Sequence, residues 1–116
     1  MEKFIRNIEH SQVLDFAGQV SYLDGQIVSR TLAQSKHHSL TLFAFDKGEE
    51  ISSHDSKGDA MVLVLEGEGR ITIDGVDHIL REKEAIVMPA TIPHAVYAQE
   101  RFKMFLIVLF PENREN

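Results

Sequence analysis

The amino-acid sequence predicts an all-β domain, built either as two packed sheets or as a closed barrel. Beyond residue 25, turn-forming residues recur about every eight to twelve positions, a spacing typical of such folds. The segments between these turns are short and either apolar or alternating, which indicates strands rather than helices. Strands of this length cannot bury one face alone, and packing two sheets or closing a barrel solves that problem.

The expected strands follow one another from residue 26 onward. Turn positions lie at Gly18 and at Asp24-Gly25 in the less informative first segment. Lys47-Gly48-Glu49 breaks the chain, Gly67-Glu68-Gly69 ends or kinks a strand, and Asp74-Gly75 is a two-residue hairpin turn. The predicted strands span residues 26–32, 39–46, 60–66, 70–74, 76–80, 85–88, 95–98 and 103–110.

Composition limits the classes of function. A chain of 116 residues supports one domain. Twelve Lys and Arg against 18 Asp and Glu give a net charge of −6, which disfavours a nucleic-acid partner. The absence of cysteine excludes disulfides and thiolate chemistry. No secretory signal and no apolar run of about 20 residues is visible, so we expect a cytoplasmic protein with no membrane partner.

Two stretches resemble the paired motifs of the cupin superfamily. Residues 48–67 read GEEISSHDSKGDAMVLVLEG, in which Gly48, His54 and Gly67 fall in register with the first motif. Residues 83–98 read KEAIVMPATIPHAVYA, which resembles the second motif at Pro89 and His94. Departures from the second motif occur at Lys83, Thr91 and Ala98.

The resemblance implies a small single-domain cupin of the conserved-barrel "cupin 2" type. Its fold would be a double-stranded β-helix, a jelly-roll-like barrel. The single domain would span residues 1–116, with the motif-bearing barrel at about 39–110. The N-terminal segment of about 35 residues would then form a cover of strand and loop.

Carrying the family's metal ligands onto this chain leaves an incomplete set. Metal-binding cupins use two His and one Glu of the first motif and the His of the second. His54 and His94 occupy the first and last of these places, but Ser56 stands in the second His place and Ala60 in the Glu place. Catalytic zinc normally has three protein ligands plus water. The resemblance therefore implies a degenerate site, at which iron, manganese, nickel or zinc would bind weakly.

Other residues near the motifs are candidates for the missing ligands. Asp59 precedes the Glu place by one residue, so strand alternation points it to the wrong face unless a bulge re-aims it. Beside a buried histidine Asp59 would suit a general base, but its Lys-Gly-Asp context favours an exposed turn. His78 lies on the hairpin and His37-His38 precede a strand, where a solvated loop pair is expected. No catalytic residue is assigned.

The resemblance places one set of residues in the barrel pocket, where a small-molecule ligand would bind. These predicted pocket residues are His54, Ser56, Ala60, Val62, His94, Val96 and Ala98. The leading hypothesis is a small-molecule-binding cupin of unknown substrate, without an assigned reaction or cofactor. The alternative is a metal-dependent dioxygenase, isomerase or decarboxylase that uses His54 and His94 on a small organic acid or carbohydrate. A structural or partner-binding module is a third hypothesis, and whether the protein is an enzyme stays open.

The last predicted strand also bears on assembly. Residues 102–110 are apolar on both faces, so the outside of the barrel needs a cover as well as the inside. A homodimer would supply that cover. The alternative is that the N-terminal 35 residues cover the same surface within one chain.

Overall fold

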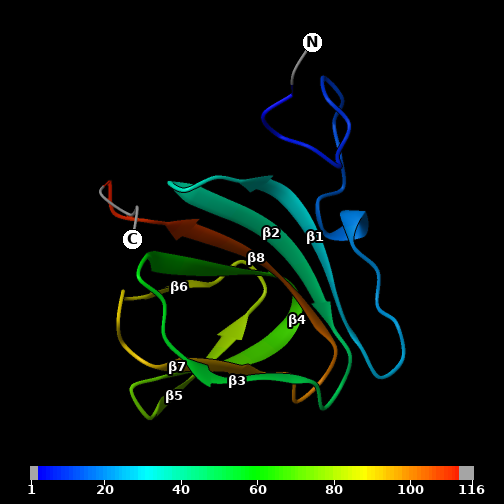
Figure 1. Ribbon diagram of the computed structural model, residues 1–116. Helices are drawn as coiled ribbons and strands as arrows, with labels where there is room; N and C mark the ends of the chain where they lie inside the picture. The colour runs from blue at the N-terminus through cyan, green and yellow to red at the C-terminus, as the bar shows by residue number, and fades with distance from the viewer. Residues whose placement is uncertain (1–2, 113–116) are drawn as a thin grey trace.

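The computed structural model describes residues 3–112, which form strands and one short 3-10 helix (Figure 1). The predicted domain also includes residues 1–2 and 113–116, which lie outside the described part. The elements in chain order are η1 (Ala17–Gln19), β1 (Ile27–Gln34), β2 (His38–Phe45), β3 (Glu50–His54), β4 (Asp59–Ile73), β5 (Val76–Arg81), β6 (Ala85–Met88), β7 (His94–Tyr97) and β8 (Phe102–Leu109).

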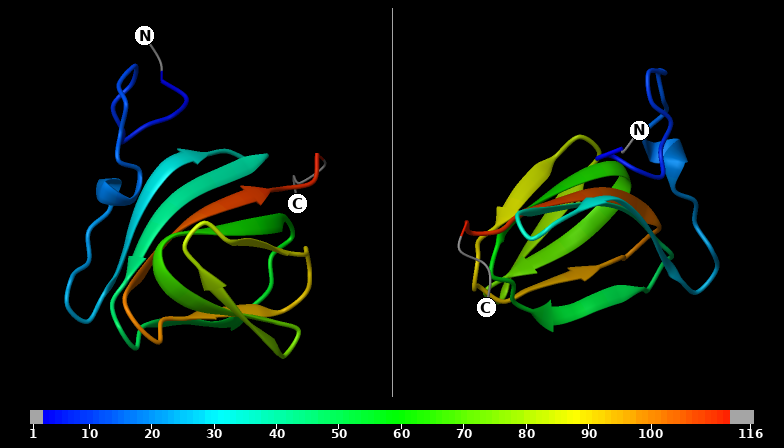
Figure 2. Two further views of the ribbon diagram at one scale, coloured as in Figure 1. Left: turned by 180° about the vertical axis from the view of Figure 1, so that it is seen from behind. Right: turned by 45° about the horizontal axis from the view of Figure 1, so that its top comes forward.

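The strands form two antiparallel sheets that share β4. The first half of β4 pairs with β8 and β6, and β8 continues through β2 to β1 at the edge. The second half of β4 pairs with β5 and β7, and β7 pairs with β3. Figure 1 and Figure 2 show both sheets curling around a common interior. The predicted all-β, jelly-roll-like barrel is therefore confirmed.

Strand β4 passes from one sheet to the other through a bulge. Val64 pairs with Met104 and Glu66 pairs with Lys103, so Leu65 is one extra residue on β4. A bulge bends its strand and interrupts the alternation of side chains. The buried residues of β4 are accordingly even-numbered before the bulge and odd-numbered after it: Ala60, Val62, Val64, Gly69 and Ile71.

Gly67 permits the bend that follows the bulge. Its φ is +75°, and a Cβ there would lie 2.5 Å from the carbonyl oxygen of Arg101. An L side chain at this position would be both strained and obstructed. The sequence predicted that residues 67–69 end or kink a strand, and the structure shows the kink. Assigning 60–66 and 70–74 to two separate strands was wrong, because β4 is continuous.

Strand β3 was not predicted. Its sequence, EISSH, contains one large apolar residue, and β3 pairs only with β7 at the edge of its sheet. A mostly exposed edge strand of this kind carries no hydrophobic pattern for sequence analysis to find. The hairpin turn at Asp74-Gly75 is confirmed, with φ of +50° and +79° at its two residues, as a type I′ turn requires.

The apolar side chains on the inner faces of the two sheets form one cluster. The rings of Phe45 and Phe102 stack with their centroids 4.8 Å apart. Gly69 lies beneath the Phe102 ring, where a Cβ would come within 2.5 Å of that ring. Each large apolar side chain buried in this way contributes about 1.5–3 kcal/mol. The cluster comprises Phe45, Ala60, Val62, Val64, Ile71, Leu80, Met88, Val96, Ala98, Phe102, Met104 and Val108.

The N-terminal segment covers part of the barrel's outer surface. Val20 is buried and, with Phe16, belongs to a second cluster that includes Leu42 of β2 and Phe105 of β8. The Phe16 and Phe105 rings meet edge to face at 5.0 Å. Burial within one chain, the alternative to a dimer, thus accounts for the outer face of β2 and part of that of β8.

Polar contacts fasten this segment to the barrel. The Tyr22 hydroxyl donates a hydrogen bond of 2.6 Å to Glu66, the residue that follows the β4 bulge. The Lys103 ammonium donates one of 2.8 Å to the carbonyl of Ala17 in η1. Both anchors lie beside the bulge, so the bend in β4 and the position of the N-terminal segment depend on each other.

Other apolar side chains stay exposed on the outer face of β4, β6 and β8, namely Met61, Val87 and Leu109. The predicted homodimer stays a prediction, and this is the surface that a second copy would cover. Among residues 3–112, the structure contains no helix long and hydrophobic enough to cross a membrane.

Replacing Gly67 with alanine should destabilise the protein more than the same change at Gly48. Both residues have positive φ, but a Cβ at Gly48 would meet nothing within 4 Å. Gly48→Ala isolates the backbone strain, about 1 kcal/mol. Gly67→Ala adds the clash with Arg101, which we expect to cost about 1–3 kcal/mol more. Urea denaturation measures both, and equal losses would contradict the role given to Gly67.

Candidate functional site

His54 and His94 form a pair at one end of the barrel. His54 is the last residue of β3, His94 is the first residue of β7, and the two are partners in the antiparallel register. Their ring centroids are 4.5 Å apart and the ring planes meet at 66°. The resemblance implied that both residues line one pocket, and the structure brings them into contact.

A second bulge gives His54 its position. Ile51 pairs with Val96 and His54 pairs with His94, so two residues of β3, Ser52 and Ser53, oppose one residue of β7, Ala95. Regular alternation would place Ile51 and His54 on opposite faces. The extra residue re-aims His54, and both residues then share the inner face with Val96 and His94. No sequence signal marks this bulge, which sequence analysis missed.

Hydrogen bonds fix the orientation of both rings. His54 Nδ1 lies 3.0 Å from the carbonyl oxygen of Ser52, and His94 Nδ1 lies 3.2 Å from that of Ile92. A carbonyl only accepts, so each Nδ1 carries the proton and donates it. In the neutral form of such a ring the lone pair lies on Nε2, and neither Nε2 has a hydrogen-bond partner among the described residues. The pair offers two adjacent acceptors.

The two histidines differ in their contact with water. His94 is 4% exposed, whereas His54 is exposed. Burial lowers the pKa of His94 below the ordinary value of 6.5, and the nearby His54 ring lowers it further. The hydrogen bond to Ile92 and the charge of Asp55 act in the opposite direction. The buried member of the pair is thus held neutral at pH 7.

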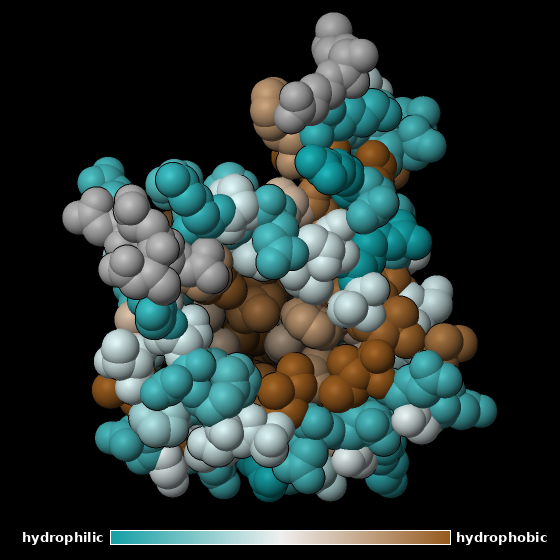
Figure 3. All heavy atoms as spheres, in the orientation of Figure 1, coloured by the Kyte–Doolittle hydropathy of each residue, from teal (hydrophilic) through white to brown (hydrophobic). Residues whose placement is uncertain are grey.

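Several of the other predicted pocket residues belong to the apolar cluster of the barrel interior. Of the predicted pocket residues, Ala60, Val62, Val96 and Ala98 are all buried in the inner cluster. Figure 3 shows a hollow with hydrophobic walls between the two sheets. Hydrophobic walls of this kind suit the apolar body of a small ligand.

Ser56 lies apart from this inner set. It occupies the loop between β3 and β4, where its Oγ is 3.1 Å from the amide nitrogen of Gly58 and accepts its hydrogen bond. Its carbonyl accepts a bond of 2.7 Å from the Thr91 amide. Ser56 therefore shapes the loop beside the histidines, and its hydroxyl is engaged there.

The described residues do not complete a metal site. Asp59 is exposed at the start of β4, and its Oδ1 accepts a hydrogen bond of 2.8 Å from the Ala90 amide. Asp59 thus anchors the loop between β6 and β7. Among residues 3–112, no three His, Asp or Glu side chains gather closely enough to hold a metal ion. His78 and the pair His37-His38 accordingly do not join His54 and His94. A complete cupin ligand set does not fit this chain.

The comparisons with known proteins agree on one family. The model of the family described as "Cupin domain" matches residues 41–110. A conserved protein of unknown function from Streptococcus pyogenes is 49% identical, with 96% of this chain and 97% of that chain covered and a TM-score of 0.94. A cupin superfamily protein from Desulfitobacterium hafniense is 33% identical, with 92% and 98% covered and a TM-score of 0.88.

A third similar structure is a longer protein. The cupin 2 conserved barrel domain protein from Leptotrichia buccalis is 44% identical, with 80% of this chain but 45% of that chain covered, at a TM-score of 0.79. The curated proteins searched give no match.

The stability of the metal-free protein should fall below about pH 6.5 because of His94. Its pKa is lower in the folded state, so at mildly acidic pH the unfolded chain binds more protons. The free energy of unfolding therefore decreases as pH falls from the unfolded pKa through the folded pKa. His94→Gln should flatten this dependence, as measured by urea denaturation between pH 5 and 8. The exposed His37→Gln is the control, and an equal flattening in both variants would contradict the assignment.

Proposed function

The chain belongs to the cupin family, and on that basis we propose that it binds a small uncharged organic molecule in its barrel without a tightly held metal ion. The observation that carries the proposal is the pair of unbonded Nε2 atoms on His54 and His94 beside an apolar interior. Fold alone does not assign a function, because one fold hosts many chemistries.

The histidine pair determines which polar group the ligand carries. A neutral imidazole whose Nδ1–H is already bound presents an acceptor at Nε2. The matching group on a ligand is a donor, such as a hydroxyl or a ring N–H. Burial of His94 keeps it neutral, so it does not act as a cationic partner for a carboxylate at pH 7.

The inner cluster indicates the polarity of the rest of the ligand. It contains no ionisable side chain, and its two alanines, Ala60 and Ala98, leave the smallest side chains on the inner face. A charged ligand would lose its hydration there without a counter-charge. The preferred ligand is accordingly an apolar molecule with one or two donor groups, such as an aromatic alcohol.

A metal-dependent enzyme is the second candidate, and one observation favours it. The two rings lie in contact, with their centroids 4.5 Å apart, and each has an unbonded Nε2, the imidazole atom that commonly ligates divalent ions. Such a dioxygenase, isomerase or decarboxylase would draw its remaining ligands from water and substrate. Two protein ligands are fewer than catalytic zinc sites use, and Ser56 and Ala60 supply neither missing ligand.

Benzyl alcohol should bind at the histidine pair, whereas toluene should not perturb it. Long-range ¹H–¹⁵N spectra of the protein report Nε2 of each ring directly. We expect the alcohol to shift the Nε2 signals of His54 and His94, because its hydroxyl donates to them. Toluene has the same ring without the donor. Equal responses to both probes, or no response to the alcohol, would contradict the proposal.

A pair of variants locates the binding. Ala60→Phe fills the inner face, at a cost of about 1–3 kcal/mol for overpacking, and should abolish the response to benzyl alcohol. Met61→Phe places the same ring on the outer face of the same strand and should leave the response unchanged. Backbone amide spectra confirm that both variants are folded. A response that survives Ala60→Phe would place the ligand outside the barrel.

A further inference from the structure

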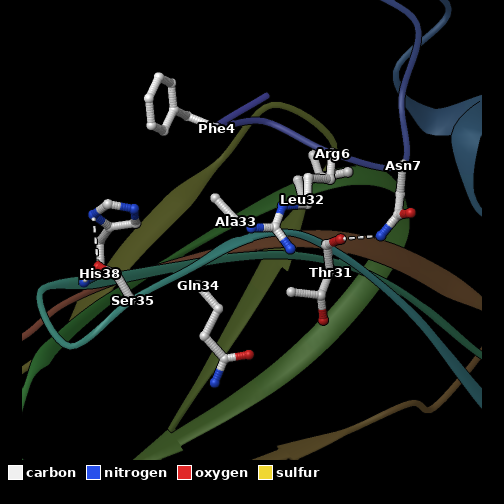
Figure 4. A pocket seen from close by; sticks show the side chains of 9 residues that line it. All are labelled: Phe4, Arg6, Asn7, Thr31, Leu32, Ala33, Gln34, Ser35 and His38. Carbon is white, nitrogen blue, oxygen red and sulfur yellow. Dashed lines mark hydrogen bonds between the residues drawn. The ribbon is translucent and has the colours of Figure 1, made fainter. Parts of the chain in front are cut away.

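A cavity lies between the N-terminal segment and the free edge of β1, on elements other than those that carry the histidine pair. Its volume is about 410 Å³, within the range of small-molecule sites. Figure 4 shows Arg6 at the centre of the cavity, Phe4 and Asn7 on the N-terminal segment beside it, and the β1–β2 turn at one end. The lining residues on β1, the turn and β2 are Thr31, Leu32, Ala33, Gln34, Ser35 and His38.

A bulge in β1 holds the N-terminal segment beside this edge. Thr31 pairs with Thr41 and Ala33 with Leu40, so Leu32 is an extra residue whose carbonyl is free of the ladder. The Arg6 amide donates to that carbonyl at 2.7 Å. The adjacent Asn7 side-chain amide donates to the Thr31 carbonyl, also at 2.7 Å. These bonds fix the backbone of Arg6 at the cavity wall.

The cavity is electropositive within an acidic protein. Arg6 carries the charge, and its guanidinium has no acceptor among residues 3–112. No Asp or Glu lines the cavity, whereas the Gln34 amide and the His38 ring add further donors. The protein as a whole carries a net charge of −6, and salt screens those charges that lie more than about 8–10 Å from the cavity. The local field therefore favours an anion.

The floor of the cavity is apolar. Leu32 and Ala33 lie beneath the cavity and are only 3% and 7% exposed, whereas Phe4 of the N-terminal segment is 79% exposed and presents an apolar ring to it. We propose that this cavity binds a small organic oxyanion whose carboxylate or phosphate pairs with Arg6 while its apolar part lies against Phe4. A planar guanidinium suits either group, because it donates two parallel hydrogen bonds to paired oxygens.

Phenyl phosphate and benzoate are the probes, with benzyl alcohol as the uncharged reference. Titration followed by backbone amide spectra gives the affinity and locates the site through the Leu32 and Ala33 amides. We expect both anions to shift these amides more strongly than the alcohol, and to bind more weakly as salt is raised. Tighter binding of phenyl phosphate assigns the phosphate class, and tighter binding of benzoate assigns the carboxylate class.

Arg6→Gln should weaken anion binding about tenfold, because it removes a hydrogen-bonding charge from the ligand. Arg81→Gln makes the same change in net charge on β5, where Arg81 is exposed beside Glu68, and should leave the affinity unchanged. The response of His54 and His94 to benzyl alcohol should survive Arg6→Gln, which keeps the two sites distinguishable. Equal weakening by both variants, equal binding of the alcohol, or anion shifts confined to the histidine pair would overturn the proposal.

Discussion

The bend in β4 is the constraint on which the rest of the structure depends. One strand serves both sheets because the extra residue at Leu65 turns the chain and Gly67 leaves room for the Arg101 carbonyl. The bulge also reverses the alternation, so Ala60 and Ile71 face the same interior although they lie on opposite sides of the bend. Without this reversal, one half of β4 would turn its polar face inward.

Bulges also position the polar groups of the histidine pair and of the Arg6 cavity. The bulge in β3 turns His54 toward His94, and the bulge in β1 frees the Leu32 carbonyl that receives Arg6. In each case an extra residue interrupts the ladder and re-aims a side chain or a backbone group. The regular parts of the strands bury the apolar side chains, and the bulges position the polar groups. This division explains why the histidine pair lies at a strand end rather than within the core.

Sequence analysis could predict the parts of the fold that follow from pattern. The Asp74-Gly75 turn and the strand at residues 85–88 agree with the structure, because turn residues and apolar runs are local signals. The motif register also brought His54 and His94 together. Strand β3, the continuity of β4 and the Arg6 cavity could not be predicted, since each depends on pairing between distant segments. The missing metal ligands at Ser56 and Ala60 were visible in the sequence, but the engagement of Ser56 with Gly58 was not.

The central claim is that His54 and His94 present free acceptors to a ligand rather than hold a metal ion tightly. Elemental mass spectrometry of untagged protein, purified without chelator and again after incubation with iron, manganese, nickel or zinc, tests it most directly. The double variant Ser56→His, Ala60→Glu restores the family's ligand set and is the positive control. We predict substoichiometric metal in the natural chain and affinity more than about tenfold higher in the variant. Near-stoichiometric metal in the natural chain, lost on His94→Ala, would contradict the account.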